Sequence, residues 1–195
     1  MSVPSRSRER QAATLAPPRL RRYDPAAMST SVAATHESYP DAQIRRILNN
    51  TKTIAMVGAS ANWNRPSYFA MKYLQAKGFR VIPVNPREVG KEILGEKVYA
   101  ELKEVPDKID MVDVFRASNA VPPIAKDAVE IGAKVLWMQL GVRNEEAAEM
   151  AERAGLTVIM NRCPKIEYGR LFGELGWSGI NTNVISSKRR QVPRK

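Results

Sequence analysis

Two hydrophobic patterns alternate along residues 41–175. Short runs of apolar and β-branched residues predict strands over 53–57, 79–84, 109–115, 133–138 and 156–160. Between them, apolar residues at three- and four-residue spacing predict helices over 41–50, 66–77, 121–131 and 145–154. Residues 90–99 fit neither pattern and are expected to form an irregular insert or a short hairpin. Strands that alternate with helices indicate a mainly parallel sheet covered on both faces, which predicts a doubly wound α/β domain of about five strands.

Helix boundaries carry their own signals. Gly78, Gly132 and Gly155 each stand between a predicted helix and the next strand, where a left-handed residue ends the helix. Pro66 suits a first helical turn, and Asn144 is a good N-cap for the helix that follows it.

The turn after the first strand predicts an anion site. The strand runs into Gly58, small residues follow in Ala59 and Ser60, and a helix begins near Pro66. Backbone N–H groups and a helix N-terminus converge in such a turn and favour a phosphate or diphosphate. The neighbouring Arg65 is expected to contact that phosphate, and the predicted ligand is therefore a nucleotide.

Two departures argue against a simple NAD site. The dinucleotide fingerprint has three glycines, whereas this loop has Gly58 alone. An acidic residue normally ends the second strand and binds the ribose, but here the sequence reads Val84-Asn85-Pro86-Arg87. Arg87 would favour a phosphorylated ribose instead. NADP and coenzyme A (CoA) both carry such a phosphate, and these residues leave both open.

Four motifs in order then resemble the CoA-binding protein family, which is similar to the N-terminal domain of the succinate–CoA ligase alpha subunit. They are Val57-Gly-Ala-Ser60 with Arg65-Pro-Ser67, Val84-Asn-Pro86, Trp137-Met-Gln-Leu-Gly141 and Met160-Asn-Arg-Cys163. The likeness spans residues 45–175. It implies a Rossmann-like fold that binds CoA or acyl-CoA.

The resemblance also implies which residues form the site. Gly58, Ala59 and Ser60 would meet the diphosphate, with Arg65 and Ser67 nearby. The expected remainder, all at the carboxyl ends of strands, comprises Asn85, Pro86 and Arg87 at the adenosine end, Ala117, Ser118, Val121 and Pro122 beside the adenine or upper pantetheine, and Gln139, Leu140 and Gly141. Trp63 and Trp137 are expected to be packing residues.

We predict no catalytic residues and no metal site. The ligases carry their phosphorylated histidine in a second domain, whereas the sole histidine here, His36, falls in a segment expected to be loose. Cys163, beside Arg162 and Lys165, is a candidate nucleophile, but a buried structural thiol is the favoured interpretation. The predicted function is thus CoA or acyl-CoA binding without catalysis. The alternatives are a small NADP-dependent oxidoreductase and a CoA-site subunit of an acyl-CoA synthetase complex.

The charge of +11 lies mainly at the ends of the chain. Residues 1–27 carry +4 and residues 188–195 carry +5, which leaves +2 for the 160 residues between them. We therefore expect a disordered basic arm over 1–40, with Met28 as an alternative start, a CoA-binding domain over 41–175 and a tail over 176–195. A transit peptide is the less favoured interpretation of the arm. No specific nucleic-acid partner and no membrane partner are expected, although a basic arm can bind nucleic acid non-specifically, and a homo-oligomer or a synthetase partner stays open. The single cysteine fits a reducing compartment, here the cytoplasm.

Overall fold

The structure, a computed structural model, describes residues 36–173. The predicted basic arm, apart from its last five residues, and the C-terminal tail lie outside these residues. In chain order the elements are α1 (Asp41–Asn50), β1 (Thr53–Val57), α2 (Pro66–Ala76), β2 (Arg80–Val84), β3 (Glu92–Ile93), β4 (Glu96–Lys97), β5 (Met111–Val114), α3 (Val121–Glu130), β6 (Val135–Met138), α4 (Glu145–Arg153), β7 (Thr157–Ile159) and α5 (Pro164–Leu171).

The main sheet has five parallel strands in the order β2-β1-β5-β6-β7. Beyond β2, Tyr99 forms a single parallel bridge to Val84, so one residue stands where a sixth strand would run. The hairpin β3–β4 precedes this bridge and confirms the expected insert. The order of the strands reverses between β1 and β5, which makes their carboxyl ends the ligand-binding edge of such a sheet. The α/β Rossmann-like prediction is confirmed.

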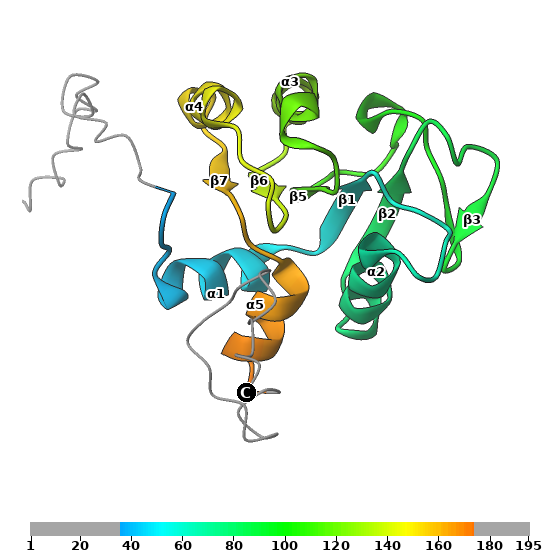
Figure 1. The fold of residues 1–195 in the computed structure, drawn as a ribbon, viewed down its shortest axis with the longest axis horizontal. Coiled ribbons are helices and arrows are strands. Elements are labelled where there is room, and N and C mark those ends of the chain that lie inside the picture. The colour runs from blue at the N-terminus through cyan, green and yellow to red at the C-terminus, as the bar shows by residue number, and fades with distance from the viewer. Residues whose placement is uncertain (1–35, 174–195) are drawn as a thin grey trace, which may run out of the picture. The chain divides into compact units, whose positions relative to one another are not determined.

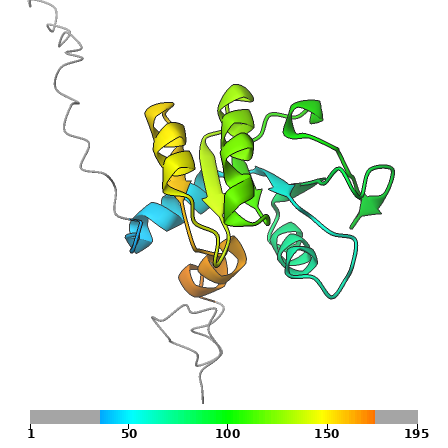
Figure 2. The same cartoon turned by 45° about the horizontal axis from the view of Figure 1, so that its top comes forward.

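Helices cover both faces of the sheet (Figure 1). Helices α3 and α4 lie on one face and α1, α2 and α5 on the other, and the turned view of Figure 2 shows the same separation. Alternate residues of each strand therefore enter different cores. Ala55 and Val112 pack toward α3 and α4, whereas Ile54, Met56 and Trp137 pack toward α1, α2 and α5. This two-sided burial explains why the strands are apolar throughout.

The predicted helix signals are confirmed. Asn144 accepts a hydrogen bond from the Ala147 N–H at 2.8 Å and so caps α4. Gly78, Gly132 and Gly155 all have positive φ angles. No helix in residues 36–173 combines the length and the apolarity needed to cross a membrane.

Helix α5 has no counterpart in the prediction. Glu167 interrupts the hydrophobic spacing of this helix. Although acidic, it faces the protein interior and is only 1% exposed. The charge is tolerated because Arg170 pairs with it at 2.7 Å and Arg162 at 3.6 Å. An inward-facing ion pair carries no apolar signal, which is why the pattern does not reveal this helix.

Two sequence expectations need correction. His36 does not lie in a loose segment, because it is 8% exposed, hydrogen-bonds the Tyr39 hydroxyl through Nδ1 at 2.9 Å and lies 3.5 Å from Glu152. Trp63 is not a packing residue, because it is 68% exposed in the β1–α2 loop, whereas Trp137 is fully buried as expected.

Candidate functional site: a cationic rim around an apolar pocket

The loops after β1 and β5 come into contact where the strand order reverses. Gly58 has a φ of +88°, and a Cβ built on it would lie 2.6 Å from the Phe115 carbonyl oxygen and 2.8 Å from Cδ of Arg116. Only glycine fits both the backbone angle and the space. The glycine that the sequence assigned to a phosphate loop is thus required by this close approach of two loops.

The β1–α2 loop uses most of its own hydrogen-bond donors. The Gly58 N–H donates to the Val84 carbonyl at 2.8 Å, and the Asn62 N–H donates to Ser60 Oγ at 3.2 Å. Within residues 36–173, the N–H groups of Ala59 and Ser60 find no acceptor. Gly58 therefore allows the loop its tight turn, whereas the N–H groups of the two residues after it remain as donors for an anion.

A carboxylate lies beside this loop although no acid ends β2. Glu88 forms an ion pair with Lys91 at 2.6 Å and lies close enough to Ser60 and Ala61 for both to affect its pKa. The hydrogen bond from Lys91, followed by these loop contacts, lowers the pKa of Glu88. No acidic residue ends β2, as predicted, and the turn that follows places Glu88 beside the β1–α2 loop.

Asn85 ties the end of β2 to the β1–α2 loop. Its Nδ2 donates to the Ala59 carbonyl at 2.7 Å, and its Oδ1 accepts from the Arg87 N–H at 3.1 Å. The residue is 8% exposed. Its amide is thus engaged in holding two loops together, while the adjoining Pro86 and Arg87 are exposed.

Three exposed arginines lie on this loop or on the segments that contact it. Arg65 precedes α2, Arg87 follows β2 and Arg116 follows β5, and none has an acidic partner within the described residues. Ser67, in the first turn of α2, is 5% exposed. Unpaired cations and free N–H groups together suit a ligand with several phosphate oxygens.

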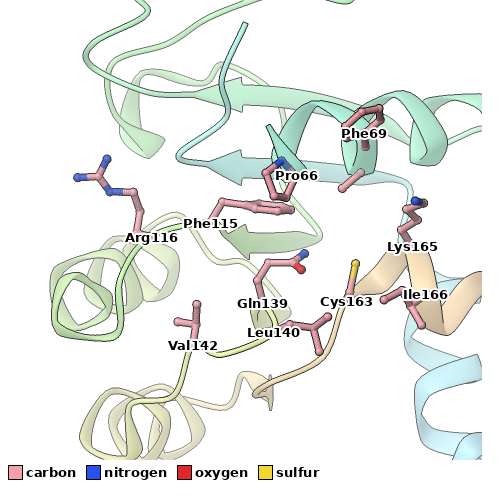
Figure 3. A pocket seen from close by; sticks show the side chains of 11 residues that line it. Pro66, Phe69, Phe115, Arg116, Gln139, Leu140, Val142, Cys163, Lys165 and Ile166 are labelled. Atoms are coloured by element: carbon pink, nitrogen blue, oxygen red, sulfur yellow. The ribbon is translucent and has the colours of Figure 1, made fainter. Parts of the chain in front are cut away.

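We call Arg65, Arg87 and Arg116 the cationic rim. Next to it lies a pocket of about 570 Å³ (Figure 3). It is enclosed by the first turns of α2 and by the segments that follow β5, β6 and β7. Most of its lining is apolar. The lining residues are Pro66, Phe69, Ala70, Phe115, Arg116, Gln139, Leu140, Val142, Cys163, Lys165 and Ile166.

Two polar side chains enter the apolar part of the pocket. Figure 3 shows the Gln139 amide and the Cys163 sulfur pointing into the same space, while the Arg116 side chain extends away from it. Gln139 Nε2 donates to both carboxylate oxygens of Asp113, at 2.8 and 3.1 Å. Asp113 lies in β5 and is fully buried, and burial raises the pKa of its carboxyl to about 7 although the Gln139 hydrogen bond opposes this.

The expected residues are divided among several positions. Gln139 and Leu140 line the pocket, whereas the Gly141 N–H donates to Asn161 Oδ1 at 2.8 Å. Ser118 accepts a hydrogen bond from the Arg143 N–H at 3.0 Å and so joins two loops. Ala117 is exposed and Pro122 is half-buried, while Val121, the first residue of α3, is fully buried in the core.

Several pocket residues were absent from the predicted set. Phe115 ends the third predicted strand and Arg116 directly follows it, so the rule that ligands bind at carboxyl ends of strands could have identified them. Phe69 and Ile166 carried no such signal, because their roles depend on how α2 and α5 approach the sheet edge.

The structure favours a structural role for Cys163. The residue is 8% exposed, and burial raises the pKa of its thiol to about 11. A thiol is a poor nucleophile when its pKa lies far above neutrality. Within residues 36–173 no three His, Cys, Asp or Glu side chains gather as a metal site would require.

The chain is similar to a known domain family and to several individual proteins. Residues 52–169 match the model of the CoA binding domain, and the chain belongs to this family. It is 42% identical over 127 residues to the uncharacterized protein YneT of Bacillus subtilis (strain 168), covering 65% of this chain and 93% of that protein. A solved structure, a hypothetical protein from Pyrococcus horikoshii OT3, is 41% identical with a TM-score of 0.67 and covers 70% of this chain and 94% of that chain.

A larger relative is an enzyme subunit. The acetate–CoA ligase [ADP-forming] I subunit alpha of Pyrococcus furiosus is 34% identical over 126 residues, which is 57% of this chain but 27% of the ligase subunit. The match thus spans about a quarter of that subunit. The resemblance to the CoA-binding family is confirmed, and the chain carries a CoA-binding domain related to ligase subunits.

Proposed function

We propose that this protein binds CoA or acyl-CoA at the carboxyl edge of its sheet and does not itself catalyse a reaction. The observation that carries the proposal is the union of a cationic rim and an apolar pocket. Arg65, Arg87 and Arg116 suit the phosphates of CoA, and the pocket beside them suits its uncharged pantetheine arm. Membership of the CoA-binding family supports the same ligand. The cytoplasm, where CoA compounds are at hand, is the proposed location.

A ligand panel tests the proposal. We expect CoA and acetyl-CoA to raise the melting temperature of the full chain, whereas NADP and NAD leave it unchanged. A ligand at 100 times its Kd should add about 2.7 kcal/mol to the free energy of unfolding. A shift with NADP and none with CoA would overturn the proposal in favour of an oxidoreductase.

The 3′-phosphate should contribute strongly to affinity. We expect dephospho-CoA to bind at least about tenfold more weakly than CoA, because a charged hydrogen bond to the missing phosphate is lost. Calorimetric titration of both ligands measures this difference. Equal Kd values would remove the basic contact that we place at the adenosine end.

The unpaired arginines should account for the anion affinity. We expect Arg65→Ala, Arg87→Ala and Arg116→Ala each to weaken CoA binding by up to about tenfold, with a smaller dependence on salt concentration. Lys52→Ala is the matched control, since Lys52 is an exposed cation just before β1 at the opposite edge of the sheet. Equal losses in Lys52→Ala and the arginine variants would mean that only net charge matters.

A second candidate function is the CoA-site subunit of an acyl-CoA synthetase complex. The 34% identity to a ligase alpha subunit is the observation that favours it. In that case the chain alone would form no acyl-CoA from an acid, ATP and CoA, but would do so once a purified partner subunit that carries the missing catalytic residues is added. Lack of activity with such partners would leave binding alone as the function.

A further inference from the structure

Asp113 is an unusual residue for the centre of a parallel sheet. It lies between Met56 of β1 and Trp137 of β6 in register, and none of its surface is exposed. Its carboxylate has no cationic partner among the described residues, and its hydrogen bonds come from one neutral group, Gln139 Nε2. Burying a carboxylate with so little compensation is costly, so the fold alone does not explain this residue.

The contact fixes how Gln139 faces the pocket. An ionised carboxylate only accepts hydrogen bonds, so the amide nitrogen of Gln139 must face Asp113. The amide oxygen is then left for the pocket, where Gln139 is one of the few polar lining residues. Without Asp113, either end of the amide could face the pocket at similar cost.

We infer that Asp113 is a positioning residue that holds the Gln139 amide with its oxygen toward the pocket, which makes the pocket selective for a ligand group that donates a hydrogen bond. This inference rests on the proposed function. The amide N–H groups of the pantetheine arm are donors of the required kind, whereas the adenosine end of CoA binds at the rim. Asp113 itself lies behind Gln139 and touches no ligand.

Two probes separate the arm from the adenosine end. CoA carries the pantetheine arm, and 3′-phospho-ADP carries the same phosphates without it. At pH 8, where Asp113 is ionised, we expect Asp113→Asn and Gln139→Leu each to weaken CoA binding by about tenfold, the loss of one good hydrogen bond. Binding of 3′-phospho-ADP should stay within about twofold of the wild type. Gln75→Leu is the matched control, since Gln75 lies on α2 and donates to the Leu94 carbonyl away from the pocket.

The double variant Asp113→Asn/Gln139→Leu tests whether Asp113 acts through Gln139. If it does, the double variant loses no more CoA affinity than Gln139→Leu alone. Additive losses, or equal losses for CoA and 3′-phospho-ADP, would overturn the inference. If CoA does not bind the wild type at all, the proposed function fails instead, so the two failures are distinguishable.

The wild-type protein offers a check that does not depend on folding of a buried variant. In NMR spectra, the Gln139 side-chain N–H resonances should show one proton shifted and protected by its bond to Asp113, and this protection should be weaker in Gln75, whose bond to the Leu94 carbonyl is 3.4 Å long. Rapid solvent exchange of both Gln139 amide protons would contradict the inference that Asp113 holds this amide in one orientation.

Discussion

Gly58→Ala should destabilise the protein by about 3 kcal/mol and abolish CoA binding. Part of this cost, about 1 kcal/mol, arises because alanine must adopt a φ of +88°. The larger part arises because the new Cβ would lie 2.6 Å from the Phe115 carbonyl oxygen, and a backbone atom cannot move aside without shifting β5. Against a typical stability of about 5–15 kcal/mol, such a loss is large. Denaturant unfolding and calorimetric titration measure the two effects.

Gly78→Ala is a matched control for this prediction. Gly78 has the same φ of +88°, but a Cβ built on it would have nothing within 4 Å. We expect Gly78→Ala to incur only the backbone cost and to leave CoA affinity unchanged. If both variants lose the same stability, the close approach of the β1 and β5 loops is not what requires glycine at position 58.

Asp113→Asn should remove a fall in stability between pH 5 and pH 8. Burial raises the pKa of Asp113 to about 7 from 3.8. The folded protein therefore holds this proton at pH values where the unfolded chain has released it. That contribution is complete below pH 3.8 and is lost as the pH rises through 7, which costs the wild type about 3 kcal/mol between pH 5 and pH 8. Unfolding free energies of both proteins over this range give the comparison.

Asp110→Asn should remove a pH dependence of stability that has the opposite sign. In the wild type, Asp110 should stabilise the fold at pH values above 3.8, its unfolded pKa, and less so at lower pH. Burial acts to raise the pKa of Asp110, but hydrogen bonds from Lys134 and from the N–H groups of Lys52 and Thr53 outweigh it and lower the pKa. Its stabilising effect is present above the unfolded pKa and lost as the pH falls through the folded value. Measurements stay below pH 8.5, because above it the Cys163 thiol ionises in the unfolded chain, where its pKa is 9.0, before it ionises in the folded protein. If the two variants change stability in the same direction with pH, the buried carboxylate is not the cause.

Local patterns predicted most of the fold. The strand Thr53–Val57 and the helix Asp41–Asn50 lie where the pattern placed them, and other elements differ by one or two residues at their ends. These predictions succeeded because each strand is buried on both faces and each helix buries one stripe, so the sequence itself carries the period. Helix α5 was missed because its inward face holds Glu167, whose charge is compensated by residues outside the pattern.

The turn between β1 and α2 was predictable for a similar reason. Gly58, Ala59 and Ser60 are consecutive, and their position between a strand and a helix indicates an anion site without further information. The arginines at the rim were partly predictable, because Arg65 and Arg87 adjoin recognisable turns. The sequence by itself thus determined the α/β class, the order of the elements and the turn between the first strand and the next helix.

Only the tertiary structure decided which side chains meet in the pocket. Phe69, Phe115, Gln139 and Cys163 come from four separate segments and converge because parallel strands end at one edge of the sheet. The same convergence places Asp113 against Gln139, 26 residues apart in the chain. Such contacts depend on strand order and on the approach of α2 and α5, whereas hydrophobic periodicity reports only which face of an element is buried.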